Sequence, residues 1–352
     1  MEKTVMYCIC SYSKFNCKIS YQIDTKYLLD NFINDFGIYY NFIFSQPIPY
    51  SVEINLHNSN KEIDFKNEFL DGEYKLIHSS HSKNKKYLLD GKIHTQKDAN
   101  KYAMFIEIGD KRIYNIKESN SLIVINGYRI DIYGENIYDD FIYIFETLLN
   151  TYFESIGGIA LHAASCTLNG SGIIICGKSG AGKTSLLFDL INKKKALFHS
   201  NDRVIVYEEN SLLACGIPIP VNVPLKAMKT FSRWSENEIV KYAENDSKIR
   251  FKVNEIPLLF DNIEKEDTVL KTVFIPNYNS SQPNIKQISA ITAMEYLELL
   301  TPIDECHPNW LNIFKNYNDV NSYRSILLKW LDQINIYIVS GNSLIDAVKD
   351  KV

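Results

Sequence analysis

The segment GIIICGKSGAGKTSLLFDLINKKKALFHSNDRVIVYE, residues 172–208, decides the fold of this chain. Within it, residues 177–184 read GKSGAGKT and match the pattern G-x-x-x-x-G-K-[ST] in full. The apolar run IIIC before the loop predicts a buried strand, and TSLLFDLI after it has the periodicity of a helix. The segment therefore predicts a strand–loop–helix unit that binds the phosphates of a nucleoside triphosphate.

Each residue type in this loop has a chemical reason. Glycines let successive backbone N–H groups turn inward around an anion, and the helix N-terminus adds its partial positive charge. Lys183 can then reach the β- and γ-phosphates, and the Thr184 hydroxyl can ligate Mg²⁺. The predicted nucleotide-binding residues are Gly177, Lys178, Ser179, Gly180, Ala181, Gly182, Lys183 and Thr184.

A polar cluster follows the next predicted strand, ALFHSND, about twenty residues downstream. A carboxylate at the end of a neighbouring strand can anchor the metal, so Asp202 is the predicted partner of Thr184 for Mg²⁺. Asn201 is a weaker candidate for the same site. The alternative is that Asn201-Asp202 forms only a turn between two strands.

His162 lies in the apolar run IALHAASCTL, which predicts one strand before the loop strand. An isolated histidine there is either a catalytic group or a satisfied core residue. Seven scattered cysteines show no C-x-x-C pair or zinc-ligand spacing, and Cys176 is predicted to be a small buried apolar residue.

Composition excludes several classes of protein. The net charge of -4 argues against a nucleic-acid binder. The chain contains no stretch of roughly 20 apolar residues that could span a bilayer, and its first residues lack a signal-peptide pattern. The sequence predicts a cytoplasmic protein without a membrane or nucleic-acid partner, and a homo-oligomer stays compatible with it.

The chain divides into a β-rich first part and an α/β second part. The turn signals Asp90-Gly91, Gly109-Asp110 and Asn126-Gly127 separate strand-like runs. A helix with one apolar face is predicted from Phe141 to Ile156, stopped by Gly157-Gly158. The domain boundary is expected in or around this helix, which gives domains 1–137 and 138–352.

Alternating strands and helices follow residue 159, as in α/β proteins. Predicted helices cover 183–193, 322–334 and 342–352, with further strands at 203–208 and 334–341. The charged segment of about residues 232–270 is assigned no structure.

Residues 157–208 resemble the catalytic domain of HPr kinase/phosphorylase. They are still more similar to the HPr-kinase-like proteins of peptide natural-product clusters, including lasso-peptide precursor kinases. The matching features are the strand bearing His162, the loop 177–184, and Asn201-Asp202 followed by Val204. A weaker resemblance continues through GIPIPVNVPLKAM, VFIPNYN and the closing strand and helix.

The resemblance implies a P-loop domain of the HPr kinase and phosphoenolpyruvate carboxykinase type, preceded by a β-rich N-terminal domain. It also implies ATP and Mg²⁺ as cofactors, and a Ser or Thr hydroxyl of a peptide or protein as the acceptor. One departure concerns the acidic pair, which in the family is normally two Asp and here begins with Asn201. An amide cannot serve as the base that this position usually supplies, which leaves Asp202 and His162. The glycine segment that marks the C-terminal part of HPr kinases is not evident, which argues against HPr as the substrate.

The leading hypothesis is a kinase of a peptide precursor, with His162, Lys183, Asn201 and Asp202 as candidate catalytic residues. Two alternatives stay open. One is a kinase of a small metabolite, such as an amino-acid hydroxyl. The other is a nucleotide-binding module that recognises a peptide without phosphorylating it.

Overall fold

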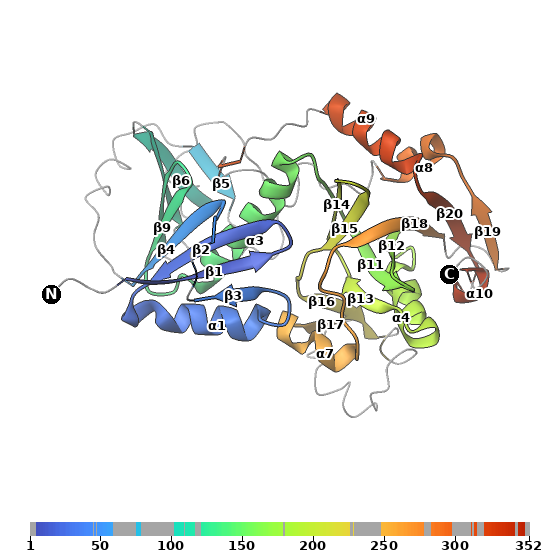
Figure 1. Ribbon diagram of the computed structural model, residues 1–352, viewed down its shortest axis with the longest axis horizontal. Helices are drawn as coiled ribbons and strands as arrows, with labels where there is room; N and C mark the ends of the chain where they lie inside the picture. Colours follow the sequence, from blue (N-terminus) through green and yellow to red (C-terminus); the bar gives the residue numbers. More distant parts are fainter. Residues whose placement is uncertain are drawn as a thin grey trace. The chain divides into compact units, whose positions relative to one another are not determined.

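The computed structural model describes residues 5–44, 46, 48–58, 75–78, 102–108, 110–116, 121–178, 180–225, 228, 248–277, 283–297, 311, 313–314, 320–341 and 344–348. Contacts divide the chain into two compact units (Figure 1). The first unit holds residues 1–155 and 303–316, and the second holds 156–302 and 317–352. The predicted turn at Asp90-Gly91 lies outside the described residues.

The first unit is built on a mixed sheet, which confirms a β-rich N-terminal part. Its described strands are β1 (Met6–Tyr12), β2 (Phe15–Tyr21), β3 (Asn41–Ile43), β4 (Val52–His57), β5 (Lys75–His78), β6 (Tyr102–Ile108), β7 (Lys111–Ile116), β8 (Ser121–Asn126) and β9 (Arg129–Tyr133). They lie in the order β3-β1-β2-β4-β9-β8-β7-β6-β5. Strand β4 pairs in parallel with both β2 and β9, and the other neighbours are antiparallel.

Two helices cover the apolar side of this sheet, α1 (Lys26–Phe36) and α3 (Tyr138–Ser155). Alternate strand residues such as Ile54 are fully buried, as expected for a sheet with one face in the core. Phe32 of α1 packs edge-on against Phe145 of α3, with ring centroids 5.0 Å apart. Aromatic rings bury large apolar areas, so this cluster binds the helices to the sheet.

The predicted amphipathic helix is confirmed as α3, and its apolar stripe is buried. The helix lies within the first unit, and the second unit begins directly after it. The segment 303–316 also belongs to the first unit, where Phe314 packs against Tyr152 with ring centroids 5.5 Å apart. A segment that returns from so far along the chain leaves no local signal in the sequence.

The second unit has the predicted α/β character. Its main sheet contains β10 (Ile159–Leu161), β11 (Ala163–Leu168), β12 (Ser171–Cys176), β13 (Leu197–Ser200), β14 (Val204–Glu208), β15 (Leu212–Gly216), β18 (Thr268–Asn277), β19 (Asn284–Gln287) and β20 (Asn335–Ser340). Strands β12, β18 and β20 are mutually parallel, and β11 runs antiparallel between β12 and β13.

Helices cover both faces of the central strands. Trp330 of α9 (Val320–Leu331) and Met294 of α8 (Ala290–Leu297) share a buried cluster with Ile174. Helix α4 (Lys183–Lys194) packs on β11 and β12, and α10 (Leu344–Val348) packs against α4. Burial on both faces explains why β12 reads as a continuous apolar run.

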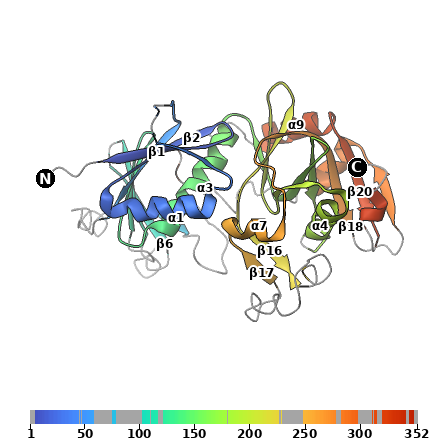
Figure 2. The same ribbon diagram turned by 60° about the horizontal axis from the view of Figure 1, so that its bottom comes forward.

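The segment left unassigned in the sequence contains regular structure. Strand β17 (Lys248–Phe251) pairs with β16 (Val221–Pro224), and the short helices η3 (Val253–Glu255) and α7 (Ile256–Leu259) follow it (Figure 2). Their charged residues alternate with buried ones over only a few positions, too few for a clear period. Among the residues that the structure describes, no helix is long and apolar enough to cross a bilayer.

Candidate nucleotide and phosphoryl-transfer site

The glycine-rich loop connects β12 to α4, as the sequence predicted. Gly180 and Gly182 have φ angles of 79° and 103°, a region that side-chain-bearing residues rarely adopt. Gly182 is also the residue before α4, and its carbonyl accepts the first helical hydrogen bond, from Leu186 N at 2.9 Å. The glycines thus turn the chain sharply from a buried strand into the N-terminus of a helix, where anions bind readily.

Lys183 folds its side chain back across this loop. Its Nζ donates a hydrogen bond to the carbonyl oxygen of Gly177 at 2.6 Å, and the residue is only 9% exposed. Burial lowers the pKa of Lys183, a shift that nearby Asp202 opposes. The ammonium is bound to a neutral carbonyl, so its charge is available to a phosphate at the loop.

The strand register brings three segments to one edge of the sheet. Ala163 at the start of β11 pairs with Cys176 at the end of β12, and Ser165 pairs with Ser200 at the end of β13. His162, the loop and Asn201-Asp202 directly adjoin these paired positions. They therefore converge although they lie up to forty residues apart in the sequence.

The predicted single strand 159–168 is wrong in one respect, because it breaks at His162 into β10 and β11. The chain breaks again between β13 and β14, at 201–203. Since β10 pairs with β14 and β11 pairs with β13, the two breaks face each other. At these facing breaks, His162 Nε2 lies 4.0 Å from Asp202 Oδ1.

His162 lies in a partly exposed and charged environment. Its side chain is 47% exposed, so the alternative of a buried core histidine is wrong. Partial burial lowers its pKa, and the positive charges of Lys183 and Arg203 act in the same direction, whereas Asp202 opposes them. The net shift favours the neutral ring, which is the form that can accept a proton.

Oxygen ligands suited to Mg²⁺ lie beside the loop. The Thr184 hydroxyl donates to Asn201 Oδ1 at 3.5 Å, and the Asp202 carboxylate follows directly in the chain. Within the described residues no cluster of three His, Cys, Asp or Glu side chains could hold a metal by itself. Mg²⁺ commonly binds one or two carboxylates together with substrate phosphates, so this set fits magnesium held jointly with a nucleotide.

The structure brings together the predicted residues Gly177, Lys178, Gly180, Ala181, Gly182, Lys183 and Thr184 with His162, Asn201 and Asp202, while Ser179 lies outside the described residues. Cys176 is fully buried, as predicted, and burial raises the pKa of its thiol to about 12. Sequence reasoning missed Lys248, whose charge also acts to lower the pKa of Lys183. Lys248 lies on β17, in the segment without periodicity, so no sequence signal marked it.

Comparison with known proteins finds a distant structural similarity and no match in sequence. No family model and no curated protein matches the chain. Among solved structures, the Hpr(Ser) kinase/phosphatase from Coxiella burnetii matches at 10% identity and a TM-score of 0.24, with 55% of this chain and 89% of that chain covered. A TM-score this low is below that of chains sharing a fold, so the site is interpreted from this chain's own residues.

Proposed function

We propose that this protein is an ATP- and Mg²⁺-dependent kinase that phosphorylates a Ser or Thr hydroxyl of a peptide or protein. The observation that carries the proposal is the meeting of the Lys183 loop with the His162–Asp202 pair at one sheet edge. The resemblance of residues 157–208 to HPr-kinase-like proteins of peptide natural-product clusters supports a ribosomal peptide precursor as the acceptor.

The loop and Lys183 would bind the nucleotide phosphates. When bound, magnesium would neutralise charge on those phosphates, and Thr184 and Asp202 would hold it. In the transfer, the bond from the terminal phosphorus to ADP breaks as the acceptor oxygen bonds to phosphorus. The hydroxyl proton passes to the neutral ring of His162 or to Asp202. Positioning and electrostatics would supply most of the acceleration.

Asn201 supports the alternative of a peptide-binding module. The residue is only 3% exposed and contacts Thr184 through its amide oxygen. An amide can orient an acceptor but cannot take its proton at neutral pH. A well-placed general base typically contributes about 10²–10⁴ in rate, so a kinase with an amide in place of the carboxylate at Asn201 would be slow. Because the acceptor's proton leaves late in a loose phosphoryl transfer, we favour a slow kinase over an inactive one.

An acceptor screen with radiolabelled ATP tests the proposal. Precursor-like peptides with Ser or Thr, free serine and free threonine would each be incubated with the full chain and MgATP, and products identified by mass spectrometry. A phosphate adduct on a peptide is the expected result. An adduct on a free amino acid alone would favour the metabolite kinase. ATP binding without any adduct would favour the binding module.

We also propose that the β-rich residues 1–137 recognise the acceptor, and the same screen tests this role. For the unaltered chain and for variants of the first unit, two quantities would be measured: the peptide concentration that gives the half-maximal rate, and the affinity for MgATP. Substitutions in the first unit should change the peptide concentration at half-maximal rate and leave the affinity for MgATP unchanged. The protein is proposed to act in the cytoplasm.

A further inference from the structure

A cavity of about 350 Å³ lies in the first unit, against the polar side of strands β2 and β4. Lys18 and Ser20 of β2, Glu53 and Asn55 of β4, and Arg129 of β9 line it. These side chains alternate with the buried apolar residues of the same strands, so they belong to the face opposite α1 and α3. Nothing in the nucleotide site uses them.

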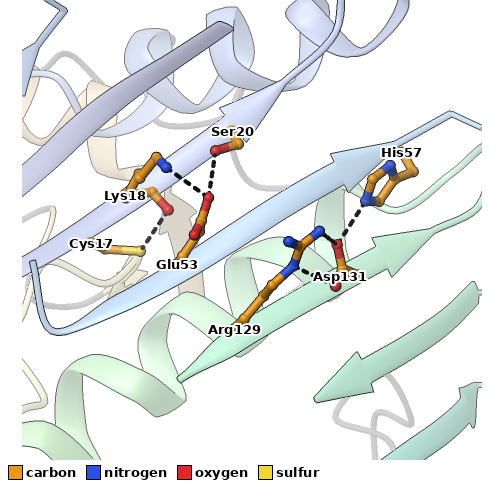
Figure 3. A network of polar contacts seen from close by, with 7 residues as sticks. All are labelled: Cys17, Lys18, Ser20, Glu53, His57, Arg129 and Asp131. Atoms are coloured by element: carbon orange, nitrogen blue, oxygen red, sulfur yellow. Dashed lines mark hydrogen bonds and ion pairs between the residues drawn. The ribbon is translucent and has the colours of Figure 1, made fainter. Parts of the chain in front are cut away.

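Two groups of ion-paired side chains lie on this face of the sheet (Figure 3). Glu53 Oε1 receives Lys18 Nζ at 2.9 Å and Ser20 Oγ at 3.0 Å. Asp131 Oδ1 receives His57 Nε2 at 3.0 Å and Arg129 Nη2 at 2.9 Å, and its Oδ2 receives Arg129 Nε at 3.0 Å. Lys18 and Arg129 are thus each paired with a carboxylate, so a ligand anion would have to compete with Glu53 and Asp131 for them.

Lys18 is held in place from several sides. Its ammonium lies 5.3 Å from the ring centroid of Tyr7 and 5.4 Å from that of Tyr50, within the range of cation–π attraction. Burial acts to lower the pKa of Lys18, but the hydrogen bond and charge of Glu53 outweigh it and raise the pKa. The lysine is therefore a fixed cation at neutral pH.

Asn55 also points to a ligand in this cavity. The residue is 7% exposed, lines the cavity, and its Nδ2 makes no hydrogen bond within the described part of the chain. A buried donor without a partner is costly, and an acceptor oxygen from a ligand would relieve that cost. Asn55 lies two residues along β4 from Glu53, which pairs with both Lys18 and Arg129, and all three donor residues line the cavity.

We infer that this cavity binds a carboxylate group, held by Lys18, Asn55 and Arg129. The carboxylate can come from a peptide, through an acidic side chain or its C-terminus, or from a free small acid. Glu53 competes with it, because Glu53 occupies Lys18 and repels a second anion. The assignment does not rest on the proposed kinase activity.

Calorimetric titration of the full chain tests the inference with four probes: Ac-Gly-Glu-Gly-NH₂, Ac-Gly-Gly-Gly-OH, free glutamate, and Ac-Gly-Gln-Gly-NH₂ as the uncharged match. At least one carboxylate probe should bind, and the glutamine peptide should not. The probe that binds best identifies the source of the carboxylate. Absence of binding by every carboxylate probe, or equal binding of the glutamine peptide, would overturn the inference.

Variants give effects of opposite sign. Lys18→Met should weaken carboxylate binding about tenfold or more, as expected on losing a charged hydrogen bond. Glu53→Gln should strengthen it about threefold or more, because a competing anion is gone while the amide oxygen still accepts from Ser20. A residue that only supports the fold would not increase affinity when replaced. Lys111→Met, at an exposed lysine of β7 that does not line the cavity, is the matched control.

Two further results decide the site. Equal affinity in Lys18→Met, Glu53→Gln and the unaltered chain would overturn the assignment. So would loss of carboxylate binding in Lys183→Ala together with its retention in Lys18→Met, since the probes would then occupy the phosphate loop. If Lys18→Met fails to fold by circular dichroism, Glu53→Gln and Asn55→Ala carry the test.

Discussion

The loop edge of the second unit and the cavity of the first unit both gather charged side chains, but they pair them differently. At the loop edge His162 and Asp202 lie 4.0 Å apart, and Lys183 donates to a carbonyl. Beside the cavity, Glu53 is paired with Lys18 at 2.9 Å, and Asp131 with Arg129 at 2.9 Å. A loosely paired side chain can contact a ligand directly. A tightly paired side chain must first break its ion pair within the protein. Substitutions at the loop edge should therefore cost function, and some in the cavity should gain it.

The largest effect is expected for Asp202→Ala, which removes both the proposed metal ligand and the partner of His162. Mg²⁺-dependent turnover should fall by about 10²–10⁴, with a smaller effect on metal-free nucleotide binding. Because Asp202 is partly exposed and loosely paired, the free energy of unfolding should change by only about 0.5 kcal/mol. Unaltered turnover across a magnesium titration would remove Asp202 from the site.

The conservative variant Asp202→Asn tests the electrostatic coupling between Asp202 and His162. The negative charge of Asp202 favours protonated His162, so its removal should lower the pKa of His162 further. Titration of the imidazole signals by NMR would measure this. A pKa that does not move would show that the pair is not coupled in solution.

The second effect concerns Lys183→Ala. Loss of a buried cation that contacts phosphate typically costs about 2–5 kcal/mol, so MgATP affinity should fall by a factor of roughly 30 or more. Calorimetric titration with MgATP measures it. Lys329→Ala is the control, since Lys329 is a lysine of the same unit paired with Glu208 at 2.6 Å. Unchanged affinity in folded Lys183→Ala would show that the loop does not bind phosphates.

A third, smaller effect is expected at Asn201. Asn201→Asp restores a carboxylate of nearly the same shape and should raise the rate about tenfold or more. Single-turnover phosphorylation of one peptide by both proteins measures it. A native rate at background, with clear gain in the variant, would indicate a binding module derived from a kinase. A lower rate in the variant would make the amide the required group and leave His162 as the base.

A last effect, on stability and not on rate, concerns His199, which lies on β13. It is buried and accepts a hydrogen bond from Gly216 N at 2.8 Å. Burial lowers its pKa from 6.5 to about 4, against the opposing charge of Asp267. Below pH 6.5 His199 takes up a proton in the unfolded chain but not in the folded chain. The free energy of unfolding contributed by His199 is therefore present above pH 6.5 and is lost as the pH falls toward 4.

His199→Gln can keep the acceptor and removes the titration. Between pH 7 and pH 5 the unaltered chain should lose about 2 kcal/mol more stability than the variant. Urea unfolding at the two pH values, followed for the second unit, provides the measurement. Equal losses in both proteins would mean that His199 titrates normally.

Sequence reasoning predicted the loop edge well and the cavity not at all. The strand, loop and helix at 171–194 appeared within one or two residues of their predicted bounds, because each has a local cause. The Asn126-Gly127 turn was displaced by one residue, since Asn126 pairs with Arg129 and the connection is Gly127-Tyr128. His162 was placed on a strand, but pairing of β10 with β14 and of β11 with β13 breaks the strand there.

The sequence by itself determined a glycine-rich loop between a buried strand and a helix, the α/β character of the second part and the β-rich character of the first. Those features depend on glycines, apolar periods and turn residues that lie next to one another in the chain. Only the tertiary structure decided that His162 faces Asp202, and that Lys18, Asn55 and Arg129 line one cavity. Those meetings depend on hydrogen-bond register between strands that are distant in the sequence, and register is fixed by the packing of the whole sheet.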